Sequence, residues 1–241
     1  MANILYVTDL HGRTEVYEQA FREAKKKEIA ALFLGGDLCP TGFHEMFIPI
    51  QREFLAHYLI PRIEKFRQDT GKPVFIMMGN DDFKANEVLL LDAEKKGTLL
   101  VTNLHRHRLD SWMIIGYSYI NETPFLLKDW EKDEKEMKKD LDNLAKGCDM
   151  ARTIVHLHAP PKNTKLDVLY DGSHVGSTAI RAFIEEQQPA LTLHGHIHES
   201  LDLSGSAVDQ LGRTVCVNPG NGNLTVIDLG KLGGAAAKKK Q

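Results

Sequence analysis

The sequence of 241 residues is long enough to bury a sizeable hydrophobic core, and its 42% hydrophobic and 26% charged residues are ordinary for a globular protein. A formal net charge of −3 gives no general attraction to nucleic acids or anionic membranes. The scattered cysteines Cys39, Cys148 and Cys216 form no Cys-Xaa-Xaa-Cys pair, so they indicate neither a disulfide framework nor a thiolate zinc site.

Membrane and secretion signals are not evident in the sequence. No apolar run approaches the roughly 18 residues of a membrane-spanning helix. Residues 1–9 enter a strand-like run without a basic segment or a cleavage site. We therefore expect a cytoplasmic protein with no membrane partner.

Strand, helix and strand follow one another at the start of the chain. Residues 4–7 and 29–34 are apolar runs typical of buried strands, and residues 14–27 have apolar side chains at helical spacing. The short spacing favours a parallel βαβ unit. Each strand is followed by an aspartate near a glycine, Asp9 and Asp37. The carboxyl ends of parallel strands lie at one edge of a sheet, so these aspartates should be close together.

The middle of the chain predicts two helices and three strands. Residues 45–69 are mostly helical, with interruptions near Pro49 and Pro61, and a strand at 73–78 and a helix at 87–96 follow. Residues 99–103 and 112–119 have the composition of strands. The connection between them is too short for a crossover, so we expect a hairpin or a neighbouring pair.

The remaining part predicts alternating helices and strands. A charged helix is expected at 125–146, with a narrow apolar stripe of Trp130, Met137, Leu141 and Leu144. A strand at 153–157, a helix at 178–188 and strands at 191–193, 214–217 and 224–228 follow. Without an internal repeat or a clear linker, we expect a single domain over 1–230 and a disordered tail over 231–241.

Polar side chains with metal-binding chemistry follow five of the predicted strands. They lie in short loops beside glycine or proline, and they are Asp9, His11, Asp37, Asn80, His158, His196 and His198. Each has an ordinary explanation alone, because aspartate caps helices, asparagine occupies turns and histidine packs in cores. Five such loops together are difficult to attribute to capping. They predict a metal centre, for which imidazole is the commonest neutral ligand.

The order of these residues resembles that of the calcineurin-like metallophosphoesterase superfamily. The matching segments are Asp-Leu-His at 9–11, Gly-Asp at 36–37, Gly-Asn-Asp at 79–81, His-Ala-Pro-Pro at 158–161 and Gly-His-Ile-His at 195–198. The segments 158–161, 174–177 and 218–220 are most similar to a small prokaryotic, especially archaeal, branch of Icc-like phosphoesterases. The resemblance implies a four-layer α/β/β/α sandwich, in which two mixed sheets are flanked by helices.

The resemblance also implies a binuclear centre, whose ligands can be carried over position by position. One ion would be held by Asp9, His11 and His198, and the other by Asn80, His158 and His196. Asp37 would bridge the two ions. Nitrogen and oxygen donors without thiolate suit manganese, iron or zinc, and the histidines argue against magnesium or calcium alone. We expect two divalent transition-metal ions, with manganese preferred over iron, zinc or nickel. A hydroxide that bridges them would attack the phosphorus of a phosphomonoester or phosphodiester.

One position departs from the family pattern. Many members have Gly-Asn-His, whose histidine is thought to contact the substrate and assist the leaving group, but this sequence has Asp81. Beside two dications we expect Asp81 to be ionised, a poor acid that could instead orient a ligand or a water. The proton for the leaving group would come from His174 or His44, or would be unnecessary for a good leaving group. Asp81 and His174 are the candidate catalytic residues, and the expected substrate is a small phosphate ester.

Two alternatives to a phosphohydrolase stay open. The same fold can serve as a non-catalytic interaction scaffold, as in a retromer subunit that has lost key ligand residues, although all seven ligand positions are intact here. A nuclease could use the lysines at 25–27 and 238–240, although the chain has no basic stripe interleaved with aromatic residues. The sequence is also compatible with a homo-oligomer.

Overall fold

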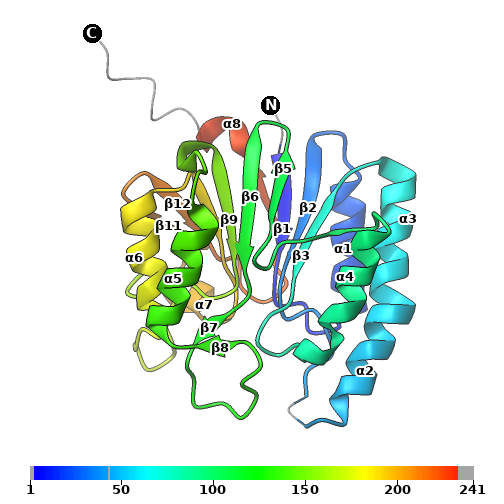
Figure 1. Ribbon diagram of the computed structural model, residues 1–241, viewed down its shortest axis with the longest axis horizontal. Coiled ribbons are helices and arrows are strands. Elements are labelled where there is room, and N and C mark those ends of the chain that lie inside the picture. Colours follow the sequence, from blue (N-terminus) through cyan, green and yellow to red (C-terminus); the bar gives the residue numbers. More distant parts are fainter. Residues whose placement is uncertain (1–2, 43, 233–241) are drawn as a thin grey trace.

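Two β-sheets pack face to face between layers of helices in the computed structural model, which describes residues 3–42 and 44–232 (Figure 1). One sheet has five strands in the order β13-β1-β2-β3-β4, and only β13 is antiparallel to its neighbour. Its strands are β1 (Asn3–Val7), β2 (Ile29–Gly35), β3 (Val74–Met77), β4 (Leu100–Val101) and β13 (Thr225–Asp228).

The second sheet has six strands in the order β11-β12-β10-β9-β6-β5, with antiparallel pairing at its two edges. Its strands are β5 (Arg106–Leu109), β6 (Trp112–Tyr117), β9 (Thr153–Leu157), β10 (Leu191–Leu193), β11 (Val208–Leu211) and β12 (Thr214–Val217). A separate parallel pair consists of β7 (Ile120–Asn121) and β8 (Glu131–Lys132).

Helices form the two outer layers. On the side of the five-stranded sheet lie α1 (Thr14–Ala24), α2 (Phe47–Phe54), α3 (Ile60–Thr70) and α4 (Glu87–Lys95), and on the side of the six-stranded sheet lie α5 (Glu134–Ala145) and α6 (Thr178–Gln187) (Figure 1). The short helices are η2 (Lys84–Asn86), η3 (Met150–Arg152), α7 (Ser200–Ser204) and α8 (Leu229–Leu232). The predicted four-layer α/β/β/α sandwich is confirmed.

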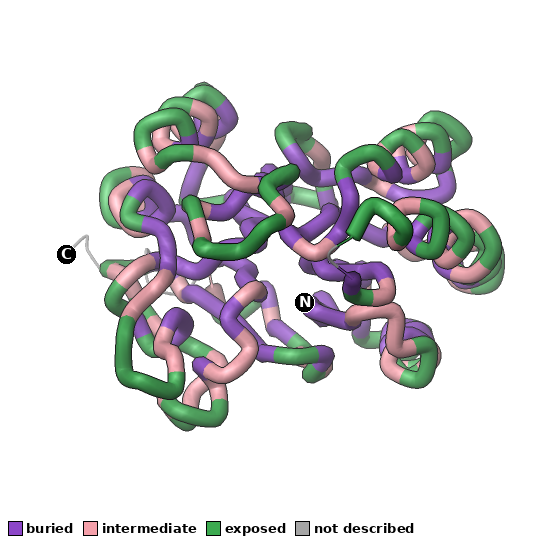
Figure 2. The backbone as a smooth tube through the Cα atoms, turned by 90° about the horizontal axis from the view of Figure 1, so that it is seen from below, coloured by how far each residue is buried: buried purple, intermediate pink, exposed green. Residues whose placement is uncertain are grey.

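Side chains alternate between two cores along the central strands, as the period of a β-strand requires. On β1, Ile4 and Tyr6 join the core between the sheets, whereas Leu5 and Val7 pack in the core beneath the helices. Phe33 on β2 stacks on Phe75 of β3 in the core between the sheets, with ring centroids 4.6 Å apart. Figure 2 shows the result, with buried strands in the middle and exposed outer sides of the helices.

The helix predicted at 125–146 begins only at Glu134, so the prediction is wrong for residues 125–133. Asp133 caps it, because its side chain accepts the N–H groups of Lys135 and Glu136. The preceding residues form a loop and β8. Trp130 fits the helical spacing by coincidence: it is buried in the core, and its indole N–H donates to the carbonyl of Asp82 (2.7 Å).

The pairing predicted for residues 99–103 and 112–119 is mostly wrong, because the two segments meet only at a parallel bridge between Asn103 and Gly116. β4 belongs to the five-stranded sheet and β6 to the six-stranded sheet, so the chain crosses from one sheet to the other between them. β6 pairs with β9 on one side and with β5 on the other, and β5 occupies the segment that the sequence had indicated as a connection. β5 carries charged and histidine side chains at the sheet edge, which concealed it from a search for apolar runs.

The prolines do not break the second helical segment as predicted. Residues 47–70 form one run of helix, in which α2 continues through a π-helical turn, η1 (Leu55–Leu59), into α3. Pro49 stands in the first turn of α2, where its missing N–H needs no partner. Pro61 follows the π-helical turn, which widens the helix where the proline ring would otherwise crowd it.

Within the described residues, no helix is long and apolar enough to cross a membrane. Of the predicted tail, Lys231 and Leu232 complete α8, and residues 233–241 lie outside the described residues. The single domain over 1–230 and the cytoplasmic location stay predictions.

The stack of Phe33 on Phe75 joins two strands that carry site loops, so it provides a test of the fold. We expect Phe33→Ala to lower the free energy of unfolding by about 3–5 kcal/mol, because it opens a cavity between the sheets. Phe125→Ala, at a side chain that is 53% exposed, is the matched control and should cost much less. Denaturant unfolding measures both, and equal losses would contradict this packing.

Candidate metal centre

Five loops meet at the lower edge of Figure 1, where the carboxyl ends of β1, β2, β3, β9 and β10 lie. Main-chain hydrogen bonds join the loops: the N–H of His11 donates to the carbonyl of Asp37 (2.8 Å), and the N–H of Gly195 to that of His158 (2.8 Å). The topology thus brings together the segments that the sequence had singled out.

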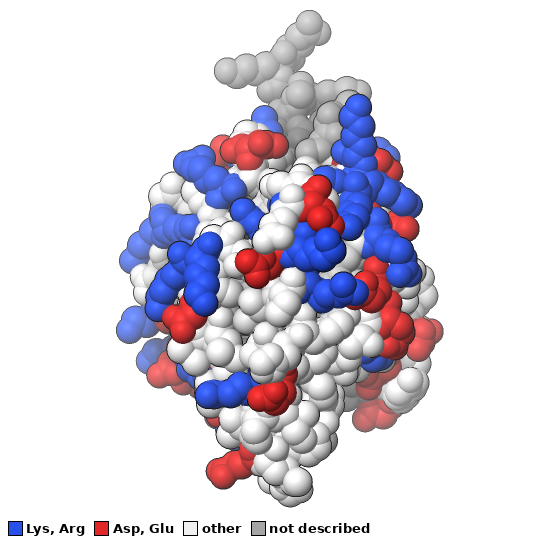
Figure 3. Space-filling model, turned by 90° about the vertical axis from the view of Figure 1, so that its right-hand side faces the viewer, with Lys and Arg blue, Asp and Glu red and all other residues white. Residues whose placement is uncertain are grey.

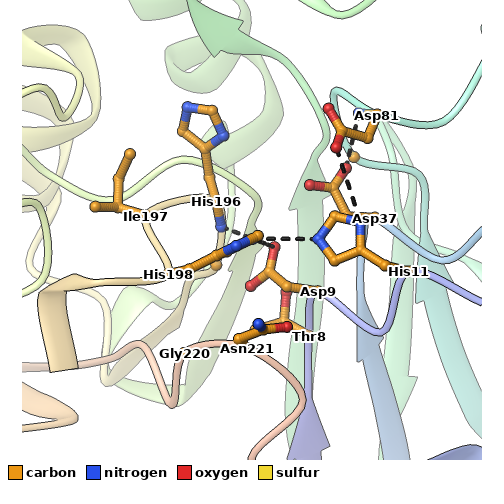
Figure 4. A network of polar contacts seen from close by, with 12 residues as sticks. Thr8, Asp9, His11, Asp37, Asp81, His196, Ile197, His198, Gly220 and Asn221 are labelled. Atoms are coloured by element: carbon orange, nitrogen blue, oxygen red, sulfur yellow. Dashed lines mark hydrogen bonds and ion pairs between the residues drawn. The ribbon is translucent and has the colours of Figure 1, made fainter. Parts of the chain in front are cut away.

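The first group of converging side chains is Asp9, His11, Asp37 and His198. Each offers one nitrogen or oxygen atom, and these atoms all lie within 4.8 Å of one another. The Nε2 atoms of His11 and His198 are 3.2 Å apart, and Nε2 of His198 is 3.4 Å from Oδ1 of Asp9 (Figure 4). These four side chains could hold one metal ion.

A second group forms on the other side of Asp37. Nε2 of His158 lies 2.9 Å from Oδ1 of Asn80 and 3.4 Å from Oδ2 of Asp37. Nδ1 of His158 donates to the carbonyl of Gly35 (2.9 Å), which leaves Nε2 as the atom that can bind a metal. The ring of His196 lies 5.5 Å from that of His158, between centroids. Asp37 therefore contacts both groups.

The backbone is strained at the centre. Asp9, His11, Asp37 and His196 all have positive φ angles, of 56°, 46°, 47° and 68°. A side-chain-bearing residue in this region costs of order 1–3 kcal/mol, and such strain concentrates at functional sites. At Asp9 and His196 the conformation has a visible use, because the N–H of His196 donates to Oδ1 of Asp9 (3.0 Å).

Glycines leave the space that the ligand side chains occupy. A Cβ at Gly79 would lie 2.3 Å from Oδ1 of Asp37 and 2.6 Å from Cε1 of His158. A Cβ at Gly195 would lie 2.7 Å from Oδ2 of Asp9. The glycines next to Asn80 and His196 thus have a steric reason, and neither has a positive φ angle.

The site holds carboxylates that are buried and mostly charged. Burial would raise the pKa of Asp37, but the charge and hydrogen bond of His158 outweigh it and hold the pKa well below its usual value. Burial opposes the charged form of His158, yet Asp37 raises the pKa of that ring to about 10. The pKa of Asp9 is likewise lowered, because His198 and His158 outweigh its burial.

Two further features fit a bound cation. Oδ2 of Asp9 is buried without a hydrogen-bond partner among the described residues, which is costly for a carboxylate oxygen. The facing Nε2 atoms of His11 and His198 can share only one proton in a hydrogen bond. Nitrogen and oxygen donors without thiolate suit a divalent transition metal, so the residues present fit such an ion.

Residues 2–200 match the family model described as calcineurin-like phosphoesterase. The chain belongs to the calcineurin-like phosphoesterase family. Membership supports a metal-dependent phosphoesterase, and the cluster around Asp37 has donor atoms that could hold a metal ion. The predicted resemblance is confirmed.

Solved structures share the fold of this phosphoesterase at low sequence identity. One crystal structure has a TM-score of 0.71 and 19% identity, over 95% of each chain. The crystal structure of TT1561 of Thermus thermophilus has a TM-score of 0.66 and 15% identity, over 94% of this chain and 98% of that chain. An archaeal phosphodiesterase has a TM-score of 0.47 and 10% identity, over 95% and 94%, too slight a likeness to bear on activity. No curated protein matches the sequence.

Asp81 lies beside both ligand groups of the phosphoesterase. Its N–H donates to Oδ1 of Asp37 (2.8 Å), and its own Oδ1 accepts the side-chain amide of Asn80 (2.9 Å). That bond turns the Asn80 carbonyl oxygen toward His158, so Asp81 orients a candidate ligand. Without a cation, burial and the charge of Asp37 raise the pKa of Asp81 to about 7, and a bound dication would oppose both effects.

A cavity of about 640 Å³ opens beside the centre. Its wall includes Asp37, Asn80, His196 and His198, together with the two candidate catalytic residues Asp81 and His174. His44, the other proton donor considered, is exposed and is not part of this wall. Of the two histidines considered as donors, only His174 lies where a bound ester could meet it.

His156 and His194 are core residues. Nδ1 of His194 donates to the carbonyl of Ala159 (2.8 Å), and its Nε2 lies 2.7 Å from Oγ1 of Thr192. Both rings are fully buried, and burial lowers the pKa of His156 to about 3 and that of His194 to about 4. They stay neutral beneath the site.

Sequence analysis missed the role of Asp82. Its buried carboxylate accepts the N–H groups of Leu38 (3.0 Å), Cys39 (2.9 Å) and Gly79 (2.9 Å). It thereby joins the loop that follows Asp37 to the loop that precedes Asn80. Its position directly after Asp81 was the only sequence signal, and turn aspartates are too common for that signal to be specific.

We expect Asp82→Asn to weaken binding of Mn²⁺ by roughly 10–100-fold, the range for partners that support metal ligands. An amide cannot accept these N–H groups on both of its terminal atoms, so the two loops would lose their common anchor. Asp92→Asn is the control, because Asp92 lies on the exposed side of α4 and pairs with Lys95. Calorimetric titration measures the affinity, and unchanged binding would contradict this role.

Proposed function

We propose that the protein hydrolyses phosphomonoesters or phosphodiesters with two divalent metal ions at the centre around Asp37. The observation that carries this proposal is the position of Asp37 between two groups of ligand-type side chains. The adjoining cavity gives an ester access to both groups. A binuclear centre is the arrangement that such a bridging carboxylate suits.

The ligand assignment follows the two groups. One ion would be held by Asp9, His11 and His198, the other by Asn80, His158 and His196, with Asp37 shared. The convergence of the first group within 4.8 Å supports the first set. The contacts of His158 with Asn80 and Asp37 support the second. The nitrogen-rich donor set favours manganese, with iron, zinc or nickel as alternatives.

Two bound dications supply Lewis acidity for a phosphoryl group and lower the pKa of a nearby water. Residues of the chain orient the proposed ligands. The Gly35 carbonyl fixes the tautomer of His158, and Asp81 holds the amide of Asn80 with its oxygen toward His158. The buried carboxylates of Asp9 and Asp37 are held by hydrogen bonds, so their charge is fixed in position before a substrate arrives.

A non-catalytic scaffold and a nuclease are the competing functions. A scaffold would not require backbone strain at the proposed ligands. It would also not require the buried Oδ2 of Asp9 to lack a hydrogen-bond partner among the described residues. A nuclease would need a basic surface, but Lys25 pairs with Asp69 (3.0 Å) and Lys26 with Glu23 (2.5 Å). Acidic and basic side chains are interspersed on the face shown in Figure 3. A homo-oligomeric state stays a prediction.

Removal of metal tests the proposal directly. We expect a chelator to abolish hydrolysis of 4-nitrophenyl phosphate, bis(4-nitrophenyl) phosphate or a cyclic nucleotide, and Mn²⁺ to restore it, because the nucleophile and the phosphoryl group both depend on the ions. Reconstitution with Fe²⁺, Zn²⁺ and Ni²⁺ ranks the metals. Hydrolysis that survives the chelator, or that no metal supports, would argue against this function.

The bridging position predicts the effect of one substitution. Asp37→Ala should lower kcat by more than the roughly 10–100-fold typical of a ligand's supporting partner, because both ions lose a ligand. Asp69→Ala, at a surface carboxylate that pairs with Lys25, is the control and should leave kcat unchanged. Steady-state kinetics with excess Mn²⁺ measures both. An unchanged kcat in Asp37→Ala would contradict the bridging role of this carboxylate.

A further inference from the structure

Asp167, like Asp82, is a buried carboxylate that is not among the proposed ligands. It is fully buried, and it accepts the main-chain N–H groups of Asn163 (3.0 Å), Thr164 (2.8 Å) and Gly176 (3.0 Å). Its Oδ1 also lies 2.8 Å from Nδ1 of His174. A buried carboxylate with several donors is held in one position, so it can fix the ring that it contacts.

The loop around His174 is itself well ordered by hydrogen bonds. Val168 and His174 form an antiparallel bridge, and the N–H of Leu169 donates to the carbonyl of Ser173 (2.9 Å). The N–H of Val175 donates to the carbonyl of Asp167 (3.2 Å). His174 therefore stands on a short hairpin whose base is fastened to Asp167.

The free atom of the ring is Nε2. Because Nδ1 donates to Asp167, Nε2 is the ring nitrogen available to a group in the cavity. The side chain is 36% exposed, and it lines the cavity whose wall also includes Asp37, Asn80 and His196. A carboxylate, an imidazole and a site for the reacting atom form the arrangement by which histidine exchanges protons in enzymes.

We propose that His174 gives a proton to the leaving oxygen of the ester and that Asp167 is its positioning residue. This inference rests on the proposed phosphoesterase function. Hydrolysis forms a bond from the water oxygen to phosphorus and breaks the bond from phosphorus to the leaving oxygen. The electron pair of the broken bond stays on that oxygen, which takes the proton from Nε2. The neutral ring then regains a proton from solvent. The attacking water has released one proton to solvent, so the two transfers balance.

The division of roles matches the departure at Asp81. The carboxylate of Asp81 accepts the amide of Asn80, so it is engaged in orienting a ligand. His174 reaches the same cavity from a different part of the chain, the segment between β9 and α6. Lys162 is the other basic side chain on this wall outside the ligand set, and it provides a comparison.

The test compares esters whose leaving groups differ in their need for a proton. Phenyl and 4-nitrophenyl phosphates, as monoesters and as methyl diesters, are given to the Mn²⁺-loaded protein. His174→Asn keeps a donor for Asp167 near the position of Nδ1 but has nothing at Nε2. We expect it to lower kcat on the phenyl esters by about 100-fold or more, as is typical for loss of a general acid, and on the 4-nitrophenyl esters far less.

Asp167→Asn should give the same dependence on the leaving group, reduced in size, because His174 remains but is no longer held. The matched controls are His57→Asn, at an exposed helical histidine, and Asp171→Asn, at an exposed carboxylate of the same loop. Neither control should change the ratio of kcat on the phenyl esters to kcat on the 4-nitrophenyl esters. If Asp167→Asn fails to fold, His174→Asn decides alone.

Each other result overturns the acid role. Equal losses on both leaving groups would assign His174 to binding or folding, and unchanged rates would leave it without a part in catalysis. A selective loss in Lys162→Met, with none in His174→Asn, would transfer the role to Lys162. If the unaltered protein hydrolyses no ester with any metal, the phosphoesterase function fails together with the acid. Hydrolysis without the expected selectivity overturns the acid alone.

Discussion

A carboxylate buried between the edges of two sheets is stable only when donors or positive charge surround it, and Asp37 meets this condition on every side. The N–H of Asp81 donates to one oxygen, and His158 lies against the other. Gly79 has no side chain because a Cβ there would occupy the space of Asp37. The need to neutralise and accommodate this one buried carboxylate thus accounts for residues in two other loops, those that follow β3 and β9.

The two cores of the fold stabilise the strained backbone of this arrangement. Strain at Asp9, His11, Asp37 and His196 is sustained because β1, β2, β9 and β10 are buried on both faces and cannot relax. Alternating side chains bind each strand to the opposite sheet and to the helices at once. Rigid strands with strained ends give a site whose groups move little when charge develops, which is the basis of electrostatic catalysis.

The sequence predicted those parts of the structure that depend on local pattern. Apolar runs located the central strands, and polar residues after them located the loops that converge at the candidate metal centre, because both signals span only a few residues. Sheet membership is not local, so β4 and β6 were paired wrongly and the polar edge strand β5 was missed. Trp130 fitted a helical spacing although tertiary contacts, not helix formation, determine its position.

Asp82 and Asp167 were missed for a further reason. Each bonds to main-chain N–H groups, which every residue type except proline carries, so no pattern in the sequence marks their partners. Asp81 and Asp167 nevertheless act alike: each is a buried or half-buried carboxylate that fixes one neighbouring polar side chain, Asn80 or His174. A carboxylate that accepts hydrogen bonds is suited to orienting a group and unsuited to donating a proton. With Asp81 in place of the family histidine, proton donation would fall to another group, and the fold distinguishes the two donors that the sequence offered, because His174 lines the cavity and His44 does not.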